Sequence, residues 1–342
     1  MNTSDRISKI LDCQDKSTLI AATKAIDSFL TIPHDDSKYI LSFSGGKDSH
    51  VLLGIYNLYL KLGFKPINLV VRFADTKLEH HSLYKTIGYT QQFCAAQQIP
   101  FEIVKGKQSY WYVQFALGYP VPNHFNRWCT GRLKIQPLMP SRKLKGITGR
   151  HFGESNARDK RLKTCGSDTC GTDKIKKSYD PIAHYSNCLV WDSLFYFDGK
   201  ILYPDVFNVL KAQYEQAEDS KTGSLRLGCF MCPVISLNTI QQNLNSGLID
   251  NKAVEIRLLL EELRQARRIK NPRTQKNGAI CVADRRVVWE KLKPYFGYLI
   301  LHGWANGLDL ANISQSLKSD YSYPPTYKKE WIDTQHQLLV SK

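Results

Sequence analysis

Hydrophobic positions in the first 150 residues follow two alternating patterns. Short apolar runs of strand length are separated by longer stretches in which apolar residues recur at helical spacing. The runs predict strands at 39–43, 67–73, 101–104 and 145–149. The stretches between them predict helices at 48–62, 79–98 and about 131–144. The alternation predicts an α/β fold, a doubly wound parallel sheet covered by helices on both faces.

Outside this alternation, three regions have different patterns. Residues about 5 to 33 are polar with helical spacing and predict a helical lead-in, so we assign 1–37 to an N-terminal segment and 38–235 to the α/β domain. A polar, glycine-rich stretch at about 155–180 predicts a loop. After Gly228-Cys229 the chain becomes helical and rich in Lys and Arg, which predicts a basic helical C-terminal region over 236–342.

Charge and cysteine content narrow the class of protein. The 342 residues carry a formal net charge of +16, which favours a polyanionic partner such as a nucleotide or nucleic acid. No stretch is long and apolar enough to span a bilayer, and the first residues do not resemble a signal peptide, so we expect a cytoplasmic protein without a membrane partner. Nine cysteines in that compartment indicate metal or redox chemistry, because disulfides are rare there.

The most informative segment is Ser44-Gly45-Gly46-Lys47-Asp48-Ser49, here called the glycine loop. It follows a predicted strand and precedes a predicted helix, an arrangement that directs backbone N–H groups toward an anion. Glycines allow the backbone to approach a phosphate closely, while Ser44, Ser49 and Lys47 add donors and positive charge. Asp48, near the helix start, is suited to hold a metal or to cap the helix.

The glycine loop resembles the PP-loop, SGGxDS, of the adenine nucleotide α-hydrolase superfamily. The resemblance implies binding of ATP with Mg²⁺ and cleavage between the α and β phosphates. It implies catalytic roles for Lys47, Asp48 and Arg150. A second segment, Ala74-Asp75-Thr76-Lys77-Leu78-Glu79, is similar to the DTGxE segment of PP-loop reductases and implies nucleotide contacts from Asp75 and Thr76. A helix cap formed by Thr76 and Glu79 is the alternative interpretation.

Two further segments extend the resemblance to phosphoadenylyl-sulfate reductase relatives. Cys129-Thr130-Gly131-Arg132-Leu133-Lys134 is similar to their CTxxLK motif, and Gly149-Arg150-His151-Phe152-Gly153-Glu154-Ser155-Asn156-Ala157-Arg158 is similar to GxRxxESxxR. Arg150 and Arg158 suit bidentate phosphate contacts, and Glu154 is placed to orient one of them or a metal-bound water. A solvated ion pair near a helix start is the alternative for these residues.

A third cysteine segment resembles the sulfurtransferase component of DNA phosphorothioation systems (DndC/SspD type). This segment is Gly228-Cys229-Phe230-Met231-Cys232-Pro233-Val234, similar to the GCxxC[PT]V motif of that group. The resemblance implies an iron–sulfur cluster, 4Fe-4S, held by Cys129, Cys229 and Cys232. Either Cys170 or Cys165 would be the fourth ligand, with Cys170 preferred, and a zinc site remains the alternative.

The resemblance favours ATP-dependent thiolation of a nucleic acid, with DNA as partner. The resemblance implies the DNA backbone as target, a separate cysteine desulfurase as sulfur donor, and other phosphorothioation-system proteins as partners. Reduction of phosphoadenylyl or adenylyl sulfate ranks second, because those reductases use a cysteine near the C-terminus and the last cysteine here is Cys281. The resemblance is also compatible with a tRNA-thiolating enzyme and with a non-catalytic iron–sulfur regulator that binds nucleotide or DNA.

Basic residues crowd the C-terminal region and suit phosphate contacts with DNA. A solvated helix face is the alternative interpretation. The residues are Arg257, Arg264, Arg267, Arg268, Lys270, Arg273 and Lys276, followed by Arg285 and Arg286.

Overall fold

The computed structural model contains two compact units built from interleaved segments. It describes residues 2–123, 125–141, 143–153, 178–216, 229, 232, 237–245, 247, 249–270, 274–320, 322–323 and 329–340. The first unit comprises Met1–Ala74, Ser82–Val104 and Ile135–Glu215. The second comprises Asp75–His81, Lys105–Lys134 and Gln216–Lys342. The predicted segment 38–235 therefore contributes to both units.

The first unit contains the predicted sheet, in the strand order β3-β2-β1-β4-β5. β1 pairs in parallel with β2 and β4, and β4 pairs in parallel with β5, which confirms the predicted parallel α/β fold. The strands are β1 Tyr39–Phe43, β2 Leu69–Asp75, β3 Phe101–Lys105, β4 Lys145–Ile147 and β5 Ser178–Tyr179. The helices are α1 Thr3–Leu11, α2 Lys16–Leu30, α3 Lys47–Lys61, α4 His81–Ala96, α5 Gln136–Leu138, α7 Asn187–Phe197 and α8 Val206–Gln216.

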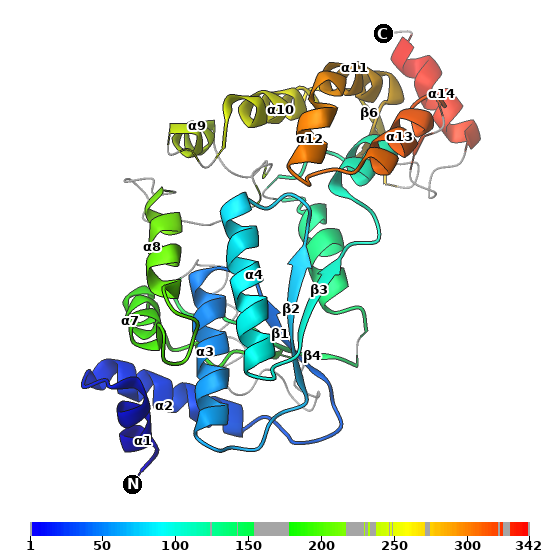
Figure 1. Cartoon of the computed structure of the whole chain (residues 1–342). Helices are drawn as coiled ribbons and strands as arrows, with labels where there is room; N and C mark the ends of the chain where they lie inside the picture. The colour runs from blue at the N-terminus through cyan, green and yellow to red at the C-terminus, as the bar shows by residue number, and fades with distance from the viewer. Residues whose placement is uncertain are drawn as a thin grey trace. The chain divides into compact units, whose positions relative to one another are not determined.

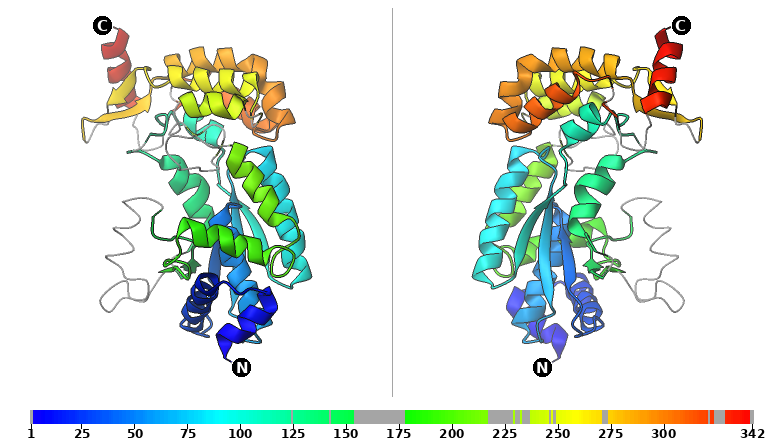
Figure 2. Two further views of the ribbon diagram at one scale, coloured as in Figure 1. Left: turned by 90° about the vertical axis from the view of Figure 1, so that its left-hand side faces the viewer. Right: turned by 90° about the vertical axis from the view of Figure 1, so that its right-hand side faces the viewer.

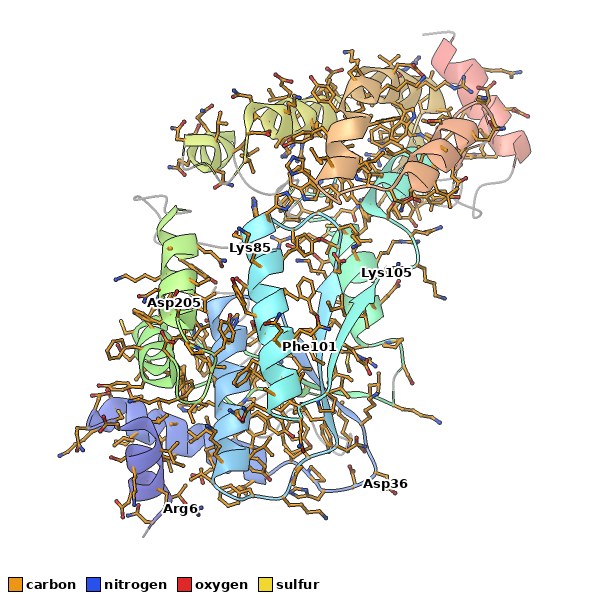
Figure 3. All side chains as sticks on the ribbon, viewed as in Figure 1. Arg6, Asp36, Lys85, Phe101, Lys105 and Asp205 are labelled. Carbon is orange, nitrogen blue, oxygen red and sulfur yellow. The ribbon has the colours of Figure 1, made fainter. Side chains whose placement is uncertain are left out.

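Helices cover both faces of this sheet (Figures 1 and 2). On one face, α3 and α4 lie along the strands, and alternate strand residues such as Leu41, Val71 and Phe73 join their apolar side chains in one buried core. On the other face, the Arg72 side chain leaves β2 and donates to the Leu138 carbonyl of α5 at 3.0 Å. Phe101 of β3 packs on Phe43 with ring centroids 6.0 Å apart, and side chains fill the space between strands and helices (Figure 3).

The predicted elements of this unit differ from the structure in three places. The lead-in is two helices, because the chain ends α1 at Asp12 with a left-handed φ of 47° and begins α2 with the Asp15 cap. The helix expected at 131–144 is a π-helical segment, Thr130–Ile135, followed by three-residue α5, and Pro140 follows shortly after. The strand expected at 145–149 ends at Ile147, and the two-residue β5 gives no sequence signal.

The second unit has its own hydrophobic core and is mostly helical. The π-helical segment Tyr112–Ala116 packs in it through Trp111 and Phe115, whose partners include Trp304 and Trp289. The elements of this unit after residue 236 are α9 Leu237–Asn245, α10 Asn251–Glu262, β6 Arg268–Lys270, β7 Asn277–Ile280, α11 Val282–Leu292, the 3-10 turn Lys293–Tyr295, α12 Phe296–Leu301, α13 Gly307–Ser316 and α14 Lys329–Val340. The helical C-terminal region is confirmed, with one antiparallel hairpin, β6–β7, that the sequence pattern did not predict.

Candidate active site at the start of α3

The glycine loop connects the end of β1 to the first turn of α3. Gly45 has a φ of +78°, a left-handed conformation that favours glycine, and a Cβ there would also displace the end of the Leu83 side chain. Gly46 is the N-cap of α3 and has no side chain that could accept from the first turn, so Asp48 is not the N-cap of α3. The first N–H groups of the helix lie at an anion-binding position, and that of Lys47 has a hydroxyl partner, Tyr214.

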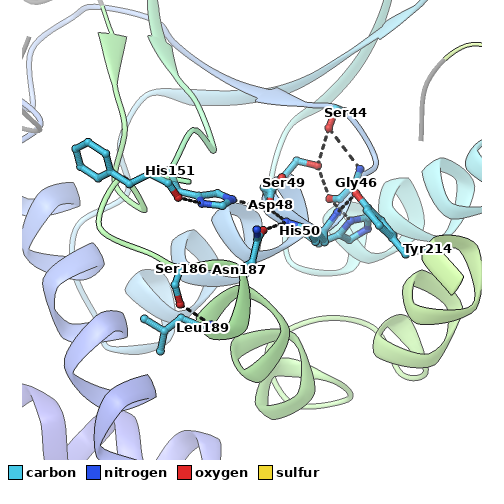
Figure 4. Close-up of polar contacts among 12 residues, drawn as sticks. Ser44, Gly46, Asp48, Ser49, His50, His151, Ser186, Asn187, Leu189 and Tyr214 are labelled. Carbon is cyan, nitrogen blue, oxygen red and sulfur yellow. Dashed lines mark hydrogen bonds and ion pairs between the residues drawn. The ribbon is translucent and has the colours of Figure 1, made fainter. Parts of the chain in front are cut away.

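Hydroxyl groups surround the turn of the glycine loop (Figure 4). Ser49 Oγ donates to the Gly46 carbonyl at 2.8 Å, and Ser44 Oγ donates to Ser49 Oγ at 3.3 Å. The Lys47 N–H donates to the Tyr214 hydroxyl at 3.4 Å. A Cβ on Gly46 would stand 3.0 Å from that same hydroxyl, so the absence of a side chain at Gly46 allows Tyr214 to approach the backbone.

Lys47 and Asp48 form a charged group with partners from distant parts of the chain. Lys47 Nζ contacts Asp48 Oδ1 at 2.5 Å and donates to Asn187 Oδ1 at 3.0 Å. His151 Nε2 lies 3.2 Å from the same Asp48 oxygen, and the imidazole is fully buried. This arrangement places one carboxylate between an ammonium group and an imidazole at the beginning of α3 (Figure 4).

The pKa values of this pair move apart. Burial would raise the pKa of Asp48, but the His151 hydrogen bond and the Lys47 charge outweigh it, so that pKa lies below its ordinary value. Burial would lower the pKa of His151, but the Asp48 hydrogen bond and charge outweigh it and raise that pKa. Asp48 is therefore anionic at neutral pH, and His151 is more readily protonated than a free histidine.

Arg150 is held beside this group by Asp180. Its Nη2 and Nε atoms donate to the two Asp180 oxygens at 2.6 and 2.9 Å, and Nε also reaches Thr148 Oγ1 at 3.1 Å. Next to it, Gly149 packs on the first turn of α3, because a Cβ there would stand 2.9 Å from the Asp48 carbonyl oxygen. The segment after β4 thus contacts α3 through Gly149 and His151, while Arg150 is oriented by a carboxylate.

Several predicted site residues lie outside the described residues. They are Glu154, Arg158, Cys165 and Cys170.

Asp75 and Thr76 fall in the second unit. Asp75 Oδ1 accepts from the Lys77 N–H at 2.8 Å, and Thr76 Oγ1 donates to Glu79 Oε1 at 2.9 Å. The predicted helix cap by Thr76 and Glu79 is wrong, because α4 begins only at His81 and this contact stabilises a turn. Lys77 adopts a φ of +60° at the position where the related reductases have glycine.

Cys129, Cys229 and Cys232 are also brought into the second unit, beside Tyr110 and Lys134. A hydrogen bond from the Cys229 thiol to the Cys232 side chain and burial raise the pKa of Cys229 well above its ordinary value, and burial and Cys232 raise that of Cys129. Lys134 contacts Glu79 at 3.1 Å. Among the described residues, no three His, Cys, Asp or Glu side chains converge closely enough to hold a metal ion. The sulfur donors suit iron or zinc, but the described residues do not form a closed site.

The basic stretch of the second unit is not one helix face. Arg257 and Arg285 are buried, and Arg285 donates to backbone carbonyls including Ile280. At the surface, Arg267 pairs with Asp284 at 2.7 Å. Arg264 is paired with Glu261, and Arg268 donates to the Gly278 carbonyl across the β6–β7 hairpin. The expectation that Arg257 and Arg285 belong to an exposed patch is therefore wrong, and Arg273 lies outside the described residues.

Comparison with known proteins identifies the family of this chain. Residues 38–235, more than half of the sequence, match the phosphoadenosine phosphosulfate reductase domain. The chain belongs to the phosphoadenosine phosphosulfate reductase domain family. The glycine loop and the segment from Gly149 to Phe152 both lie within the family region.

One curated relative and one solved structure illustrate what the chain is similar to. The chain is 29% identical over 217 residues to the uncharacterized protein MJ0066 of Methanocaldococcus jannaschii, covering 59% of this chain and 38% of that protein. The chain thus spans well under half the length of this relative. A phosphoadenylyl-sulfate reductase from Candida auris, solved as a phosphate complex, matches 61% of this chain and 92% of its own at 14% identity and a TM-score of 0.36. In the described part of the chain, no helix is both long and apolar enough to cross a membrane.

Some site residues of this family member were not assigned from the sequence. His151 lies inside the Gly149–Arg158 segment, directly after Arg150, and this position is the sequence signal that indicates a place in the site. Asn187, Asp180 and Tyr214 carry no local pattern, and the fold brings them to Lys47, Arg150 and the glycine loop.

Proposed function

We propose that this chain is an ATP pyrophosphatase and sulfurtransferase that adenylylates an oxygen of a nucleic acid and enables its replacement by sulfur. The DNA backbone is the proposed target. The observation that supports it is the beginning of α3, where a left-handed Gly45, an N-cap without a side-chain hydrogen bond and the Lys47 ammonium group form a site for phosphates. The family match supports the coarser part of the proposal, nucleotide chemistry connected with sulfur.

In the first step, the target oxygen attacks the α-phosphorus of ATP, and the bond from that phosphorus to the bridging oxygen breaks. Pyrophosphate leaves, and the glycine-loop N–H groups and Lys47 stabilise its developing negative charge. Asp48 stays anionic and orients Lys47 through their 2.5 Å contact. Its carboxylate suits Mg²⁺, which would neutralise phosphate charge when bound.

In the second step, a sulfur nucleophile attacks the backbone phosphorus that bears the adenylylated oxygen. The bond from that phosphorus to the oxygen breaks, and the oxygen leaves as part of AMP. When the sulfur arrives as a persulfide, a second thiol then cleaves the S–S bond and is oxidised to a disulfide with the carrier cysteine. We propose that a separate cysteine desulfurase supplies this sulfur, with other phosphorothioation-system proteins as partners. Cys129, Cys229 and Cys232, together with Cys170 or Cys165, are the proposed ligands of an iron–sulfur cluster. Thiolates are the usual ligands of such clusters, and three of these cysteines lie near Tyr110 and Lys134.

The products of ATP cleavage test this proposal. The protein is incubated with ATP labelled at the α-phosphate, with Mg²⁺ and duplex DNA, and we expect labelled AMP and an equal amount of pyrophosphate. Lys47→Ala and Asp48→Ala should abolish the reaction in folded protein. Lys61→Ala is the matched control, because Lys61 ends the same helix and donates to the Lys200 carbonyl at 2.7 Å. ADP and phosphate as products would contradict α–β cleavage.

A second measurement identifies the thiolated molecule. Mass spectrometry of nuclease-digested host DNA should reveal phosphorothioate linkages that disappear with the Lys47→Ala copy. Thiolated nucleosides in the tRNA fraction would assign the target to tRNA instead. ATP binding without any cleavage would indicate a regulator.

The family match favours a second candidate function, reduction of a sulfonucleotide. Purified protein would then release sulfite from phosphoadenylyl sulfate or adenylyl sulfate with a thiol reductant. The reaction consumes no ATP, so the two functions are distinguished by their substrates in parallel assays.

A further inference from the structure

The imidazole of His50 lies buried directly beneath the glycine loop. It is fully excluded from solvent, and its ring packs against Phe43 with centroids 4.8 Å apart. Its Nδ1 atom lies 3.0 Å from the Gly46 carbonyl oxygen. Its Nε2 atom lies 3.2 Å from the Tyr203 hydroxyl and 3.3 Å from Thr90 Oγ1. Both ring nitrogens therefore have partners, and one partner is the backbone of the loop.

These contacts fix the tautomer of His50. The ring is fully buried and its nitrogens face a carbonyl and two hydroxyls, which favours the neutral form with one N–H. A carbonyl oxygen is an acceptor, so the proton belongs on Nδ1 and Nε2 must accept. Thr90 Oγ1 already donates its proton to the Thr86 carbonyl at 2.8 Å. Tyr203, whose hydroxyl also contacts the Thr90 hydroxyl, is the remaining group that can donate to Nε2, and burial raises the pKa of Tyr203, which keeps its hydroxyl protonated.

The resulting chain of hydrogen bonds runs from Tyr203 through His50 to the Gly46 carbonyl. That carbonyl also accepts from Ser49 Oγ at 2.8 Å and from the His50 backbone N–H at 3.1 Å. In a trans peptide unit the C=O and the next N–H point in opposite directions. Holding the Gly46 carbonyl toward His50 therefore holds the Lys47 N–H away from the core, toward Tyr214.

We propose that His50 is a positioning residue for phosphate binding, which fixes the Gly46–Lys47 peptide so that the Lys47 N–H faces the bound phosphate, and that Tyr203 sets its tautomer. This inference rests on the proposed function, because it assumes that the glycine loop binds pyrophosphate. His50 itself does not touch the ligand, and its effect passes through the Gly46 carbonyl.

Calorimetric titration with inorganic pyrophosphate tests the role of His50. In His50→Phe the ring and its packing stay but the donor is lost, and we expect binding about 10-fold weaker, the usual size of one lost hydrogen bond. In His50→Asn a side-chain amide N–H replaces Nδ1–H, and we expect binding within about threefold of the wild type. Rescue by Asn at similar thermal stability separates positioning from a purely structural role.

Two further variants form a matched pair around Nε2. Tyr203→Phe removes the donor that sets the tautomer, and we expect pyrophosphate binding to weaken about threefold. Thr90→Val removes a hydroxyl that lies at nearly the same distance from Nε2 but does not donate to it. We expect this variant to bind pyrophosphate as the wild type does. Both variants are informative if His50→Phe does not fold.

The outcomes separate this inference from the proposed function. If the wild type cleaves ATP to AMP and pyrophosphate but the His50→Phe and Tyr203→Phe variants bind pyrophosphate as the wild type does, the inference is overturned and the function stands. If pyrophosphate binding follows the predicted order but ATP gives other products, the inference stands and the function fails. Wild-type protein that binds no pyrophosphate overturns the inference.

Discussion

The His151 imidazole lies 3.2 Å from the Asp48 carboxylate, although the two residues are 103 positions apart in the chain. His151 follows β4 and Asp48 lies in the first turn of α3, so the contact ties the segment after one strand to the loop after its neighbour. Any change that removes this contact affects Lys47 as well, because Lys47 contacts the same oxygen at 2.5 Å.

The His151–Asp48 pair predicts a pH-dependent contribution to stability. The pKa of His151 is raised above 6.5, so its contribution is complete below 6.5 and is lost as the pH rises through the raised value. The pKa of Asp48 is lowered below 3.8, so its contribution is complete above 3.8 and is lost as the pH falls through the lowered value. The pair thus contributes most to the free energy of unfolding between pH 3.8 and pH 6.5.

Urea unfolding at several pH values checks this prediction. We expect His151→Gln to lower the free energy of unfolding by about 1–2 kcal/mol near pH 5.5, the range for a charge-assisted hydrogen bond, and by less above pH 8. His34→Gln is the control, because that imidazole is exposed. An equal loss at both pH values would show that the pair is not charged in the folded protein.

Gly149 and Gly88 form a second comparison. A Cβ on Gly149 would stand 2.9 Å from the Asp48 carbonyl oxygen, whereas a Cβ on Gly88 within α4 meets nothing within 4 Å. We expect Gly149→Ala to destabilise the protein by about 1–3 kcal/mol and to weaken pyrophosphate binding, because the first turn of α3 must shift. Gly88→Ala should be neutral or stabilising by up to about 1 kcal/mol, as for glycine in a helix. Thermal unfolding and calorimetric titration measure both effects.

The cysteines of the second unit predict a metal centre. Protein purified without oxygen should be brown and contain iron and sulfide, and Cys129→Ser, Cys229→Ser and Cys232→Ser should each lose them. Cys94→Ala is the control, because Cys94 is buried in α4 of the first unit. Single substitutions of Cys165 and Cys170 identify the fourth ligand. Stoichiometric zinc without visible absorption would leave a structural metal site in place of the cluster.

The exposed arginines of the second unit predict salt-dependent DNA binding. Replacing Arg264, Arg267 and Arg268 together with Gln should weaken duplex binding and reduce the slope of log affinity against log salt by about 0.9 for each lost phosphate contact. Glu261, Asp284 and the Gly278 carbonyl compete with DNA phosphates for these three arginines.

Fluorescence titration at several salt concentrations measures this slope. The control replaces Lys9, Lys16 and Lys24, exposed on α1 and α2, with Gln and makes the same change in net charge. If both triple variants change the slope equally, the arginines act through net charge alone.

The sheet and the glycine loop could be predicted because their signals are local. Alternating apolar runs marked β1 to β4, and Gly45 and Gly46 marked the turn before α3. Three features had no local signal. The β6–β7 hairpin lies in a stretch whose charges suggested a solvated helix. The buried Arg285 donates to the Ala116 carbonyl, 169 positions away in the chain. Asn187 and Tyr214 reach the site through long-range packing.

The two hydrophobic cores contain residues from inside and outside the family region, which determines how the chain can be shortened. Trp111 and Phe115 lie inside the family region, yet their partners Trp304 and Trp289 lie beyond its end at residue 235. At the other end, Ile7 and Phe29 precede the family region and belong to the core of the sheet. A fragment of residues 38–235 would therefore expose two unfinished apolar surfaces. The ends of the family region, residues 38 and 235, are therefore not positions at which the chain can be cut and still fold.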